Sequence, residues 1–268
     1  MYAPRSGTSA DRPTTLPAAS FRLHRGHRLR RALADPAVLT AAVLIQIALV
    51  VFIVWPLVRV VVVSLTPEGT WSTAAYTAQL RSWYVQRAVR NSLVVGVATA
   101  TASLALGFAY AYTVVRTAVP LRRVLHLLAI LPIVSPPFVS SIAIILLFGR
   151  GGLITARVLG LHDFSIYGLW GLLLAQVMTF APVAYLVLRG VLEGIAPVLE
   201  DAALNLGAGR WTVFRRVLLP LATPGLAGAF LVVFIESLAD FGNPLLLAGS
   251  AFPVLSVQAY LQITGMLR

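Results

Sequence analysis

Cysteine and lysine are both absent from this chain of 268 residues. Without cysteine, the chain forms no disulfide bond, offers no thiolate to a metal and has no cysteine nucleophile. All 21 of its basic residues are arginine. The phosphate-binding loop GxxxxGK[ST] needs a lysine ammonium at the β- and γ-phosphates, so the chain cannot carry the standard form of that loop. If ATP drives this protein, another polypeptide hydrolyses the ATP.

Charged residues of any kind are scarce, at 11% of the chain, whereas 59% is hydrophobic. Soluble domains carry about 25% charged and roughly 45–50% apolar residues. A water-soluble fold of this length could not bury so much apolar surface, so a lipid bilayer is the expected solvent.

The formal net charge of +12 would suit a nucleic-acid partner, but the placement of the arginines favours membrane lipid and no nucleic acid. Many of them crowd the segment before the first apolar run, which is typical of a cytoplasmic tail facing anionic lipid. These residues are Arg5, Arg12, Arg22, Arg25, Arg28, Arg30 and Arg31.

The apolar stretches predict an all-α fold, a polytopic transmembrane helix bundle over residues 37–268. Residues 1–36 have the composition of a disordered basic tail. Five stretches near the ~20 residues that cross a bilayer follow it. The predicted spans are 38–63, 91–115, 124–148, 168–188 and 223–247. The segment after Ala248 is too short and too mixed for a sixth span, so we expect the sequence to be incomplete at its C-terminus.

The distribution of arginine between the connecting segments predicts the orientation. With the N-terminus in the cytoplasm, most arginines lie on the inner side, as is usual for membrane proteins. The inner segments then hold the tail arginines and Arg116, Arg122, Arg123, Arg189, Arg210, Arg215 and Arg216, and the outer segments hold Arg81, Arg87, Arg150, Arg157 and Arg268. We expect a multi-pass protein of the cytoplasmic (inner) membrane.

The inner connection 189–222 is long and has two amphipathic pieces. The first is a short helix with small and apolar residues on one face, namely Leu199, Ala202, Ala203 and Leu206. Gly207 and Gly209 are expected to end it. The second piece, 211–218, is expected to stop at Pro220 before the last span. Such helices either dock in the groove of a partner protein or lie on lipid headgroups.

The same loop resembles the EAA motif of ABC-transporter permeases of the MetI-like type. Asp201-Ala202-Ala203 is followed after three residues by Gly207 and after nine more by Val217-Leu218-Leu219-Pro220. Asp201 stands where the motif has Glu, and Val217 where it has Ile. The resemblance implies the type I ABC importer permease fold and a coupling helix that docks on an ATPase subunit. The implied coupling residues are Glu200, Asp201, Ala202, Ala203, Leu206, Gly207 and Pro220.

Three further stretches look like the ferric-iron branch of these permeases: FGRGGLITARVLG, DFSIYGLWGLLLAQVMTFAPVAYLVLRGVLE and ESLADFGNPLLLAG. The resemblance implies a non-enzymatic permease subunit of an ATP-driven, binding-protein-dependent ferric-iron importer that works by alternating access. It implies an ATP-binding subunit dimer at the cytoplasmic face, an extracytoplasmic solute-binding protein and a second permease half. ATP is then used on the partner, with no cofactor on this chain. Relatives that move thiamine, polyamines, phosphonates or sulfate share the architecture, and an ion-coupled secondary transporter or a scaffold stays open.

Polar residues within the predicted spans are candidates for the translocation pathway. Glu236 and Asp240 are four residues apart, hence on one helical face, and a carboxylate at mid-bilayer costs roughly 2.5–3.5 kcal/mol. Asn243 follows, next to a proline expected to disrupt the helix. This face either lines the pathway for a cationic solute or forms hydrogen bonds between helices.

In the third predicted span, Ser135 and Pro136 mark either a gate or a passive kink. The four histidines, His24, His27, His126 and His162, form no clustered ligand set, so no metal site is expected on this chain.

Overall fold

A computed structural model describes residues 36–66, 69–136, 138–161, 164–249 and 252–265. Within these ranges every regular element is a helix. The chain divides into two compact units, Met1–Tyr76 and Thr77–Arg268. The predicted disorder of the tail concerns residues 1–36, which lie outside the described part of the chain except for Pro36.

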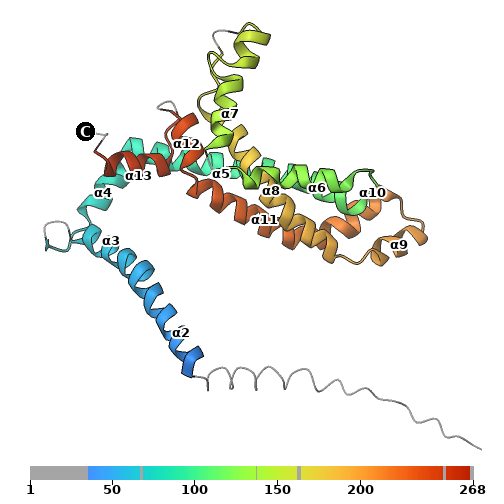
Figure 1. The fold of residues 1–268 in the computed structure, drawn as a ribbon, viewed down its shortest axis with the longest axis horizontal. Helices are drawn as coiled ribbons and strands as arrows, with labels where there is room; N and C mark the ends of the chain where they lie inside the picture. Colours follow the sequence, from blue (N-terminus) through green and yellow to red (C-terminus); the bar gives the residue numbers. More distant parts are fainter. Residues whose placement is uncertain (1–35, 67–68, 137, 162–163, 250–251, 266–268) are drawn as a thin grey trace, which may run out of the picture. The chain divides into compact units, whose positions relative to one another are not determined.

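The main element among the described residues of the first unit is one long apolar helix, formed by α2 (Pro36–Leu49), the π-helical turn η1 (Val50–Val54) and α3 (Trp55–Leu65) (Figure 1). The π turn ends at Val54, two residues before Pro56. Proline lacks an N–H group and its ring crowds the carbonyl four residues back, which the wider turn accommodates. No side chain of α2 or α3 is buried. Apart from Gln46 and Arg59 this helix is almost entirely apolar, and an apolar helix that is not buried needs lipid or a partner around it.

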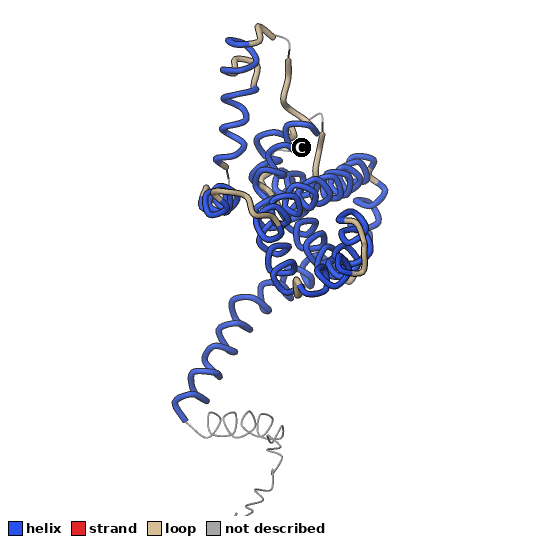
Figure 2. The backbone as a smooth tube through the Cα atoms, turned by 90° about the vertical axis from the view of Figure 1, so that its right-hand side faces the viewer, coloured by secondary structure: helices blue, strands red, loops and turns tan. Residues whose placement is uncertain are grey.

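The second unit is built on α5 (Trp83–Arg116), α8 (Leu169–Gly194) and α11 (Leu219–Ala239), which pack against one another in all three pairs (Figures 1 and 2). The buried face of α5 carries small residues at intervals of three and four: Ala88, Ser92, Gly96, Ala100, Ser103, Gly107 and Ala111. Small side chains let membrane helices approach closely. A Cβ atom on Gly107 would lie 2.7 Å from the backbone nitrogen of Tyr185 in α8.

Shorter helices connect and extend this bundle. They are α4 (Ala74–Arg81), α6 (Arg122–Ile130), η3 (Leu131–Val134), α7 (Val139–Phe148), η4 (Leu153–Val158), α9 (Val198–Asn205), α10 (Arg210–Val213), η5 (Phe214–Leu218), α12 (Gly242–Leu247) and α13 (Leu255–Ile263). By length and composition, 5 helical stretches of the described residues could cross a membrane: Pro36–Leu65, Trp83–Arg116, Val139–Val158, Leu169–Gly194 and Arg210–Ala239. The all-α bundle with five spans is therefore confirmed.

The predicted third span, 124–148, is divided in the structure. Helix α6 and the 3₁₀ turn η3 end at Val134, and α7 begins at Val139. Ser135 is extended, with ψ of 137°, because a residue before proline is disfavoured in the helical region. The stretch long enough to cross the bilayer is Val139–Val158, so the boundaries predicted for this span differ from those observed.

The predicted fifth span, 223–247, also ends early. Helix α11 ends at Ala239 and Asp240 is extended, with ψ of 125°. We expected the helix to break at Pro244, but this proline lies inside α12. A proline in the first turn of a helix costs no hydrogen bond, because that N–H group would have no helical partner.

Pro220 does not separate the loop from the last span, contrary to the expectation. The turn η5 leads into α11 without a break, and Pro220 occupies its first turn. As at Pro56, a π turn that ends two residues before the proline accommodates its ring. The connection itself is shorter than 189–222, because α8 runs on to Gly194.

Candidate functional site

Helix α9 contains the acidic and alanine residues of the motif and ends in a defined C-terminal turn. The backbone nitrogen of Gly207 donates to the carbonyl of Leu204 at 2.9 Å, and that of Ala208 donates to Ala203 at 3.1 Å. This pair of bonds is the Schellman arrangement, which requires a left-handed residue after the helix. Gly207 has φ of +85° and supplies it. The predicted helix stop at Gly207 is confirmed.

The second predicted stop, Gly209, has a different role. Its φ is −70° and its ψ 156°, an extended conformation open to any residue, and it is the N-cap of α10. Glycine is one of the residues found at this position. The prediction that Gly209 helps to end α9 is wrong, since the Schellman turn is complete at Ala208.

One arginine holds α9 to the bundle. Nε of Arg116, at the end of α5, lies 3.0 Å from Oε1 of Glu200, and the two side chains are 9% and 21% exposed. The same guanidinium donates to the carbonyls of Leu192 at 2.9 Å and Ile195 at 2.8 Å, at the end of α8. Carbonyls at a helix end have few or no partners within the helix; that of Leu192 accepts in addition from the backbone nitrogen of Ile195, at 3.3 Å. Arg116 therefore connects α5, the end of α8 and α9.

Most other residues of α9 and of the turn after it face outward, although Ala203 is half-buried. Val198 is 65% exposed, Leu199 46% and Leu206 89%, and Asp201 and Ala202 are exposed. An uncovered apolar strip on a short helix suits a protein partner, since such patches mark interaction sites. The predicted coupling residues thus form two sets: Glu200 faces the bundle, whereas Asp201, Ala202 and Leu206 face away from it.

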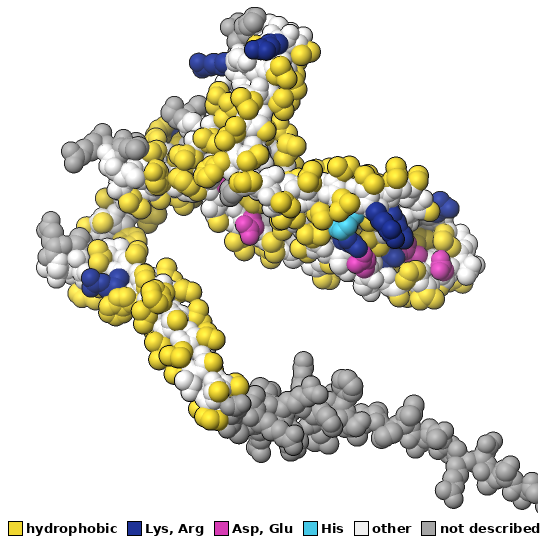
Figure 3. Space-filling model, in the orientation of Figure 1, with side chains coloured by type: hydrophobic (Ala, Val, Ile, Leu, Met, Phe, Trp, Pro, Cys, Tyr) yellow, Lys and Arg dark blue, Asp and Glu magenta, His cyan; other side chains and the backbone are white. Residues whose placement is uncertain are grey.

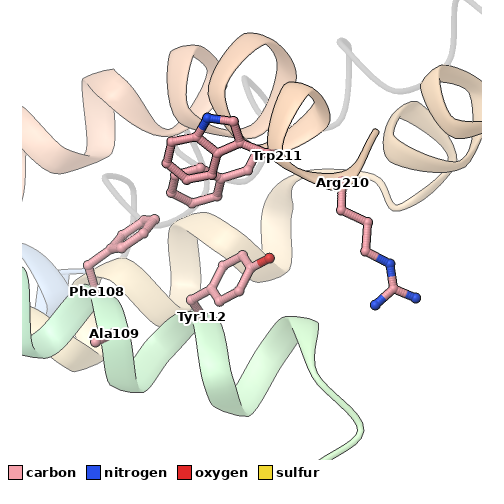
Figure 4. A pocket seen from close by; sticks show the side chains of 6 residues that line it. Phe108, Ala109, Tyr112, Arg210 and Trp211 are labelled. Carbon is pink, nitrogen blue, oxygen red and sulfur yellow. The ribbon is translucent and has the colours of Figure 1, made fainter. Parts of the chain in front are cut away.

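Aromatic contacts fix the segment that follows α9. The ring of Trp211 stacks on Phe214 at 5.3 Å between centroids, and Phe214 meets Tyr112 of α5 edge-on at 5.6 Å. Beside these rings is an open cavity of about 370 Å³ (Figure 4). It is lined by Phe108, Ala109, Tyr112, Arg210, Trp211 and Phe214. Pro220, six residues after Phe214, is exposed.

A second polar assembly lies in the middle of the bundle, centred on Gln176 of α8. Its Oε1 accepts from Oγ1 of Thr99 at 2.9 Å and from Oγ of Ser237 at 2.7 Å, which joins α5 and α11 to α8. Its Nε2 donates to Oδ2 of Asp240 at 3.0 Å. Gln176, Thr99 and Ser237 are all buried. A buried amide with partners from every neighbouring helix fixes their register.

The carboxylate of Asp240 extends this network toward α12 and α7. Its Oδ2 also accepts from Nδ2 of Asn243 at 2.9 Å, and Oδ1 accepts from the backbone nitrogen of Asn243 at 3.3 Å. Oδ1 of Asn243 accepts from Oγ of Ser141 at 2.7 Å. The backbone carbonyl of Asp240 accepts from Ser256 of α13 at 2.9 Å. These bonds explain why the helix breaks at Asp240 and resumes at Gly242.

The structure does not bring the predicted pathway residues together on one face. Asp240 follows the end of α11 and is held in the network, so it does not share a helical face with Glu236, which is exposed. Ser135 and Pro136 are also exposed, at the break between η3 and α7. Their role in translocation stays a prediction.

Sequence reasoning missed Arg116, Gln176 and Thr99 as structural centres. Gln176 carried a signal, because an amide inside an apolar span needs partners within the membrane. For Arg116 the sequence carried no such signal beyond its positive charge. Among the residues that the structure describes, no group of three or more His, Asp or Glu side chains is placed to hold a metal ion.

The helical bundle, its membrane-spanning stretches and the exposed helix α9 define a multi-span membrane protein of the transporter class. The chain belongs to the family of binding-protein-dependent transport system inner membrane components, whose model matches residues 103–266. This confirms the resemblance to MetI-like ABC-transporter permeases. Members of this family are multi-pass transport subunits of the inner membrane and are not enzymes.

Two relatives that are named as ferric transport permeases align along most of the chain. The ferric transport system permease protein FbpB of Actinobacillus pleuropneumoniae is 35% identical over 246 residues, 89% of this chain and 35% of the relative. A putative ferric transport system permease protein, FbpB 1 of Haemophilus influenzae, is 34% identical over 86% of this chain and 37% of its own length. The chain therefore spans little more than a third of these relatives.

Other matches show how widely the architecture is used. The molybdenum transport system permease protein ModB of Escherichia coli K12 is 37% identical over 130 residues, 48% of this chain and 56% of the relative. A solved bacterial alginate ABC transporter, in complex with its periplasmic protein, has a chain that superposes with a TM-score of 0.72. It covers 89% of this chain and 88% of its own at 18% identity, which establishes a common fold.

Proposed function

We propose that this chain is a permease half of an ATP-driven, binding-protein-dependent importer of ferric iron. The observation that carries the proposal is the identity of 35% with a ferric transport permease along 89% of the chain. The described residues of the stretches quoted above for the ferric-iron branch lie within the second unit. Ferric iron is the cargo of this importer, and ATP is used on a partner chain.

The geometry of α9 supports coupling to an ATPase dimer. Its outward face, with Asp201, Ala202 and Leu206, is free to enter a groove of the ATPase. Its inward face is held by Glu200 and Arg116 to the ends of α5 and α8. A displacement of α9 by the ATPase is therefore transmitted to the two most extensively packed helices. That linkage suits alternating access, in which packed elements move as units.

The remaining partners follow from the same proposal. An extracytoplasmic binding protein delivers the solute, and a second permease half, fused or separate, completes the pathway. The N-terminus lies in the cytoplasm, as the arginine distribution favours. The end of the bundle that carries α9 then faces the cytoplasm, where the ATPase is.

A second candidate solute is molybdate or a related oxyanion, favoured by the identity of 37% with a molybdenum permease over 130 residues. The two candidates predict opposite charges for the cargo. Uptake of radiolabelled ferric iron and of radiolabelled molybdate by a deletion strain, with and without the restored wild-type chain, distinguishes them. Loss and rescue of iron uptake alone supports the proposal, and loss of molybdate uptake alone replaces iron with the oxyanion.

The same strain distinguishes an ATPase-coupled importer from an ion-coupled transporter. Replacing Ala203 and Gly207 with bulky residues is expected to abolish both uptake and co-purification of the ATPase. Uptake that persists and depends on the proton gradient would reject ATP coupling.

A further inference from the structure

A basic cavity lies between α5, α6 and α8, near the end of the bundle that carries α9. Its volume is about 400 Å³. It is lined by Val114, Val115, Arg122, Arg123, His126, Arg189 and Glu193. The three arginines outnumber the single carboxylate, so the cavity has an excess of positive charge. Figure 3 shows basic, acidic and histidine side chains gathered on this part of the second unit.

The polar side chains that line the cavity differ in their partners. Those of Arg189, His126 and Glu193 already form hydrogen bonds with protein groups, whereas Arg122 and Arg123 are in no ion pair within the described residues. Nε of Arg189 donates to Oε1 of Glu193 at 2.7 Å, and its Nη1 lies 3.0 Å from Nε2 of His126. Nδ1 of His126 is 2.6 Å from the hydroxyl of Tyr185. In the described part of the chain, neither Arg122 nor Arg123 has a carboxylate within ion-pair distance, and both are exposed. Two adjacent guanidinium groups are thus available to an anion.

An apolar groove on the same seam of helices lies next to this cavity. Its volume is about 210 Å³. Apolar residues of α5, α6, η3 and α8 line it, among them Leu106, Leu128, Pro132, Met178 and Tyr185. Tyr185 connects the two features, because it lines the groove and its hydroxyl lies 2.6 Å from Nδ1 of His126, which lines the basic cavity. A ligand that fills both has an anionic head and an apolar chain.

We propose that the basic cavity binds the phosphate of an anionic phospholipid, with one acyl chain in the adjacent groove. Guanidinium groups bind phosphate oxygens through charge-assisted hydrogen bonds, and basic pockets between membrane helices accept lipid headgroups. Inorganic phosphate offers the same headgroup chemistry, but it has no part that fills the groove. The orientation given in the proposed function places this site at the cytoplasmic leaflet of the membrane. Binding of the lipid does not depend on that orientation.

Native mass spectrometry of the delipidated full-length protein tests the site, with phosphatidylglycerol, phosphatidylcholine or inorganic phosphate added. We expect phosphatidylglycerol to bind more tightly than phosphatidylcholine. The double variant Arg122→Gln/Arg123→Gln is expected to weaken phosphatidylglycerol about 30-fold, as two arginines near a membrane surface contribute. Arg122→Lys/Arg123→Lys keeps the charge and should retain most of the binding, which also shows that changes at these positions are tolerated.

The matched control is Arg150→Gln/Arg157→Gln, which removes the same charge from exposed arginines around η4. If both double variants lose the same affinity for phosphatidylglycerol, the loss is an effect of net charge alone and the proposed site is overturned. Inorganic phosphate that competes fully with the lipid would overturn the lipid assignment and make free phosphate the ligand. The measurement uses neither ATP nor iron, so its failure leaves the proposed transport function untouched, and a failed iron-uptake experiment leaves this site untouched.

Discussion

Arg116 and Glu200 form the ion pair that fixes α9 to the transmembrane bundle, with 3.0 Å between Nε and Oε1. The pair is neither fully buried nor freely exposed, at 9% and 21% of the side-chain surfaces. Exposed pairs contribute about 0–1 kcal/mol, whereas breaking a buried pair costs about 3–5 kcal/mol. An intermediate value is expected here.

A double-mutant cycle with Arg116→Gln and Glu200→Gln should give an interaction energy of about 1–2 kcal/mol. Arg116→Gln alone should be the more damaging change, because it also removes the bonds to the carbonyls of Leu192 and Ile195. Thermal unfolding of the four proteins in detergent measures both quantities. Additive single changes would show that the pair does not stabilise α9.

The neighbouring carboxylate provides the control. Asp201 is exposed and its charge is the same as that of Glu200. Asp201→Asn should leave the unfolding temperature unchanged and weaken association with the ATPase. Glu200→Gln should lower uptake per ATP hydrolysed. Reversed effects of the two changes would mean that the assignment of inward and outward faces is wrong.

Gly207→Ala should disturb α9 through backbone strain alone. At φ of +85°, an L-residue is disfavoured by about 1–2 kcal/mol, although a Cβ atom there would meet no heavy atom within 4 Å. Gly207→Asn should be milder, since asparagine tolerates the left-handed region. The readout is the affinity for the ATPase subunit, because α9 makes few contacts with the rest of the bundle.

Gly209→Ala serves as the control for this prediction. Gly209 has equally open surroundings but an ordinary φ of −70°. Its substitution should change the affinity by much less than Gly207→Ala does. Equal losses would show that the turn between α9 and α10 tolerates no added methyl group, whatever the backbone conformation.

The features that were predicted correctly depend on residues close to one another in the sequence. The number of spans follows from the length of each apolar run, and the end of α9 follows from a glycine that supplies a positive φ. The break at Asp240 could not be predicted in this way. It depends on hydrogen bonds from Gln176, on another helix, and from Ser256, further along the chain.

The same limit applies to Arg116. Its charge predicted the side of the membrane, but its partners depend on how α5, α8 and α9 end beside one another. The division of the third span at Ser135 had a local cause, the prolines on either side of it. The sequence indicated a kink there, and the structure shows a complete interruption between η3 and α7.

Asp240→Asn should destabilise the bundle, although it changes only one atom. Both carboxylate oxygens accept from N–H groups, Oδ2 from Gln176 and Asn243, and Oδ1 from the backbone of Asn243. An amide in either orientation places an NH₂ donor against another donor. The cost is about 1–3 kcal/mol, as for a buried group left without its partner, and is measurable by thermal unfolding.

Glu236→Gln is the matched change, since Glu236 is exposed and makes no hydrogen bond or ion pair within the described residues. It should shift the free energy of unfolding by no more than about 0.5 kcal/mol. If Glu236 lines the pathway for a cation, iron uptake falls while stability is kept. Unchanged uptake would remove Glu236 from the predicted pathway.

Gly107→Ala and Gly190→Ala should have effects of opposite sign on stability, although both add one methyl group to a helix. At Gly107 the new Cβ would lie 2.7 Å from the backbone nitrogen of Tyr185 and 2.9 Å from Cβ of Ala184. These atoms are part of the backbone of α8 or attached directly to it, so they cannot move aside alone. Helices α5 and α8 must therefore separate, at a cost of about 1–3 kcal/mol. At Gly190 no heavy atom lies within 4 Å, and alanine is the better helix former by about 1 kcal/mol. Thermal unfolding of the two variants measures the difference, and a Gly107→Ala protein as stable as the wild type would show that the close contact between α5 and α8 does not hold in the membrane.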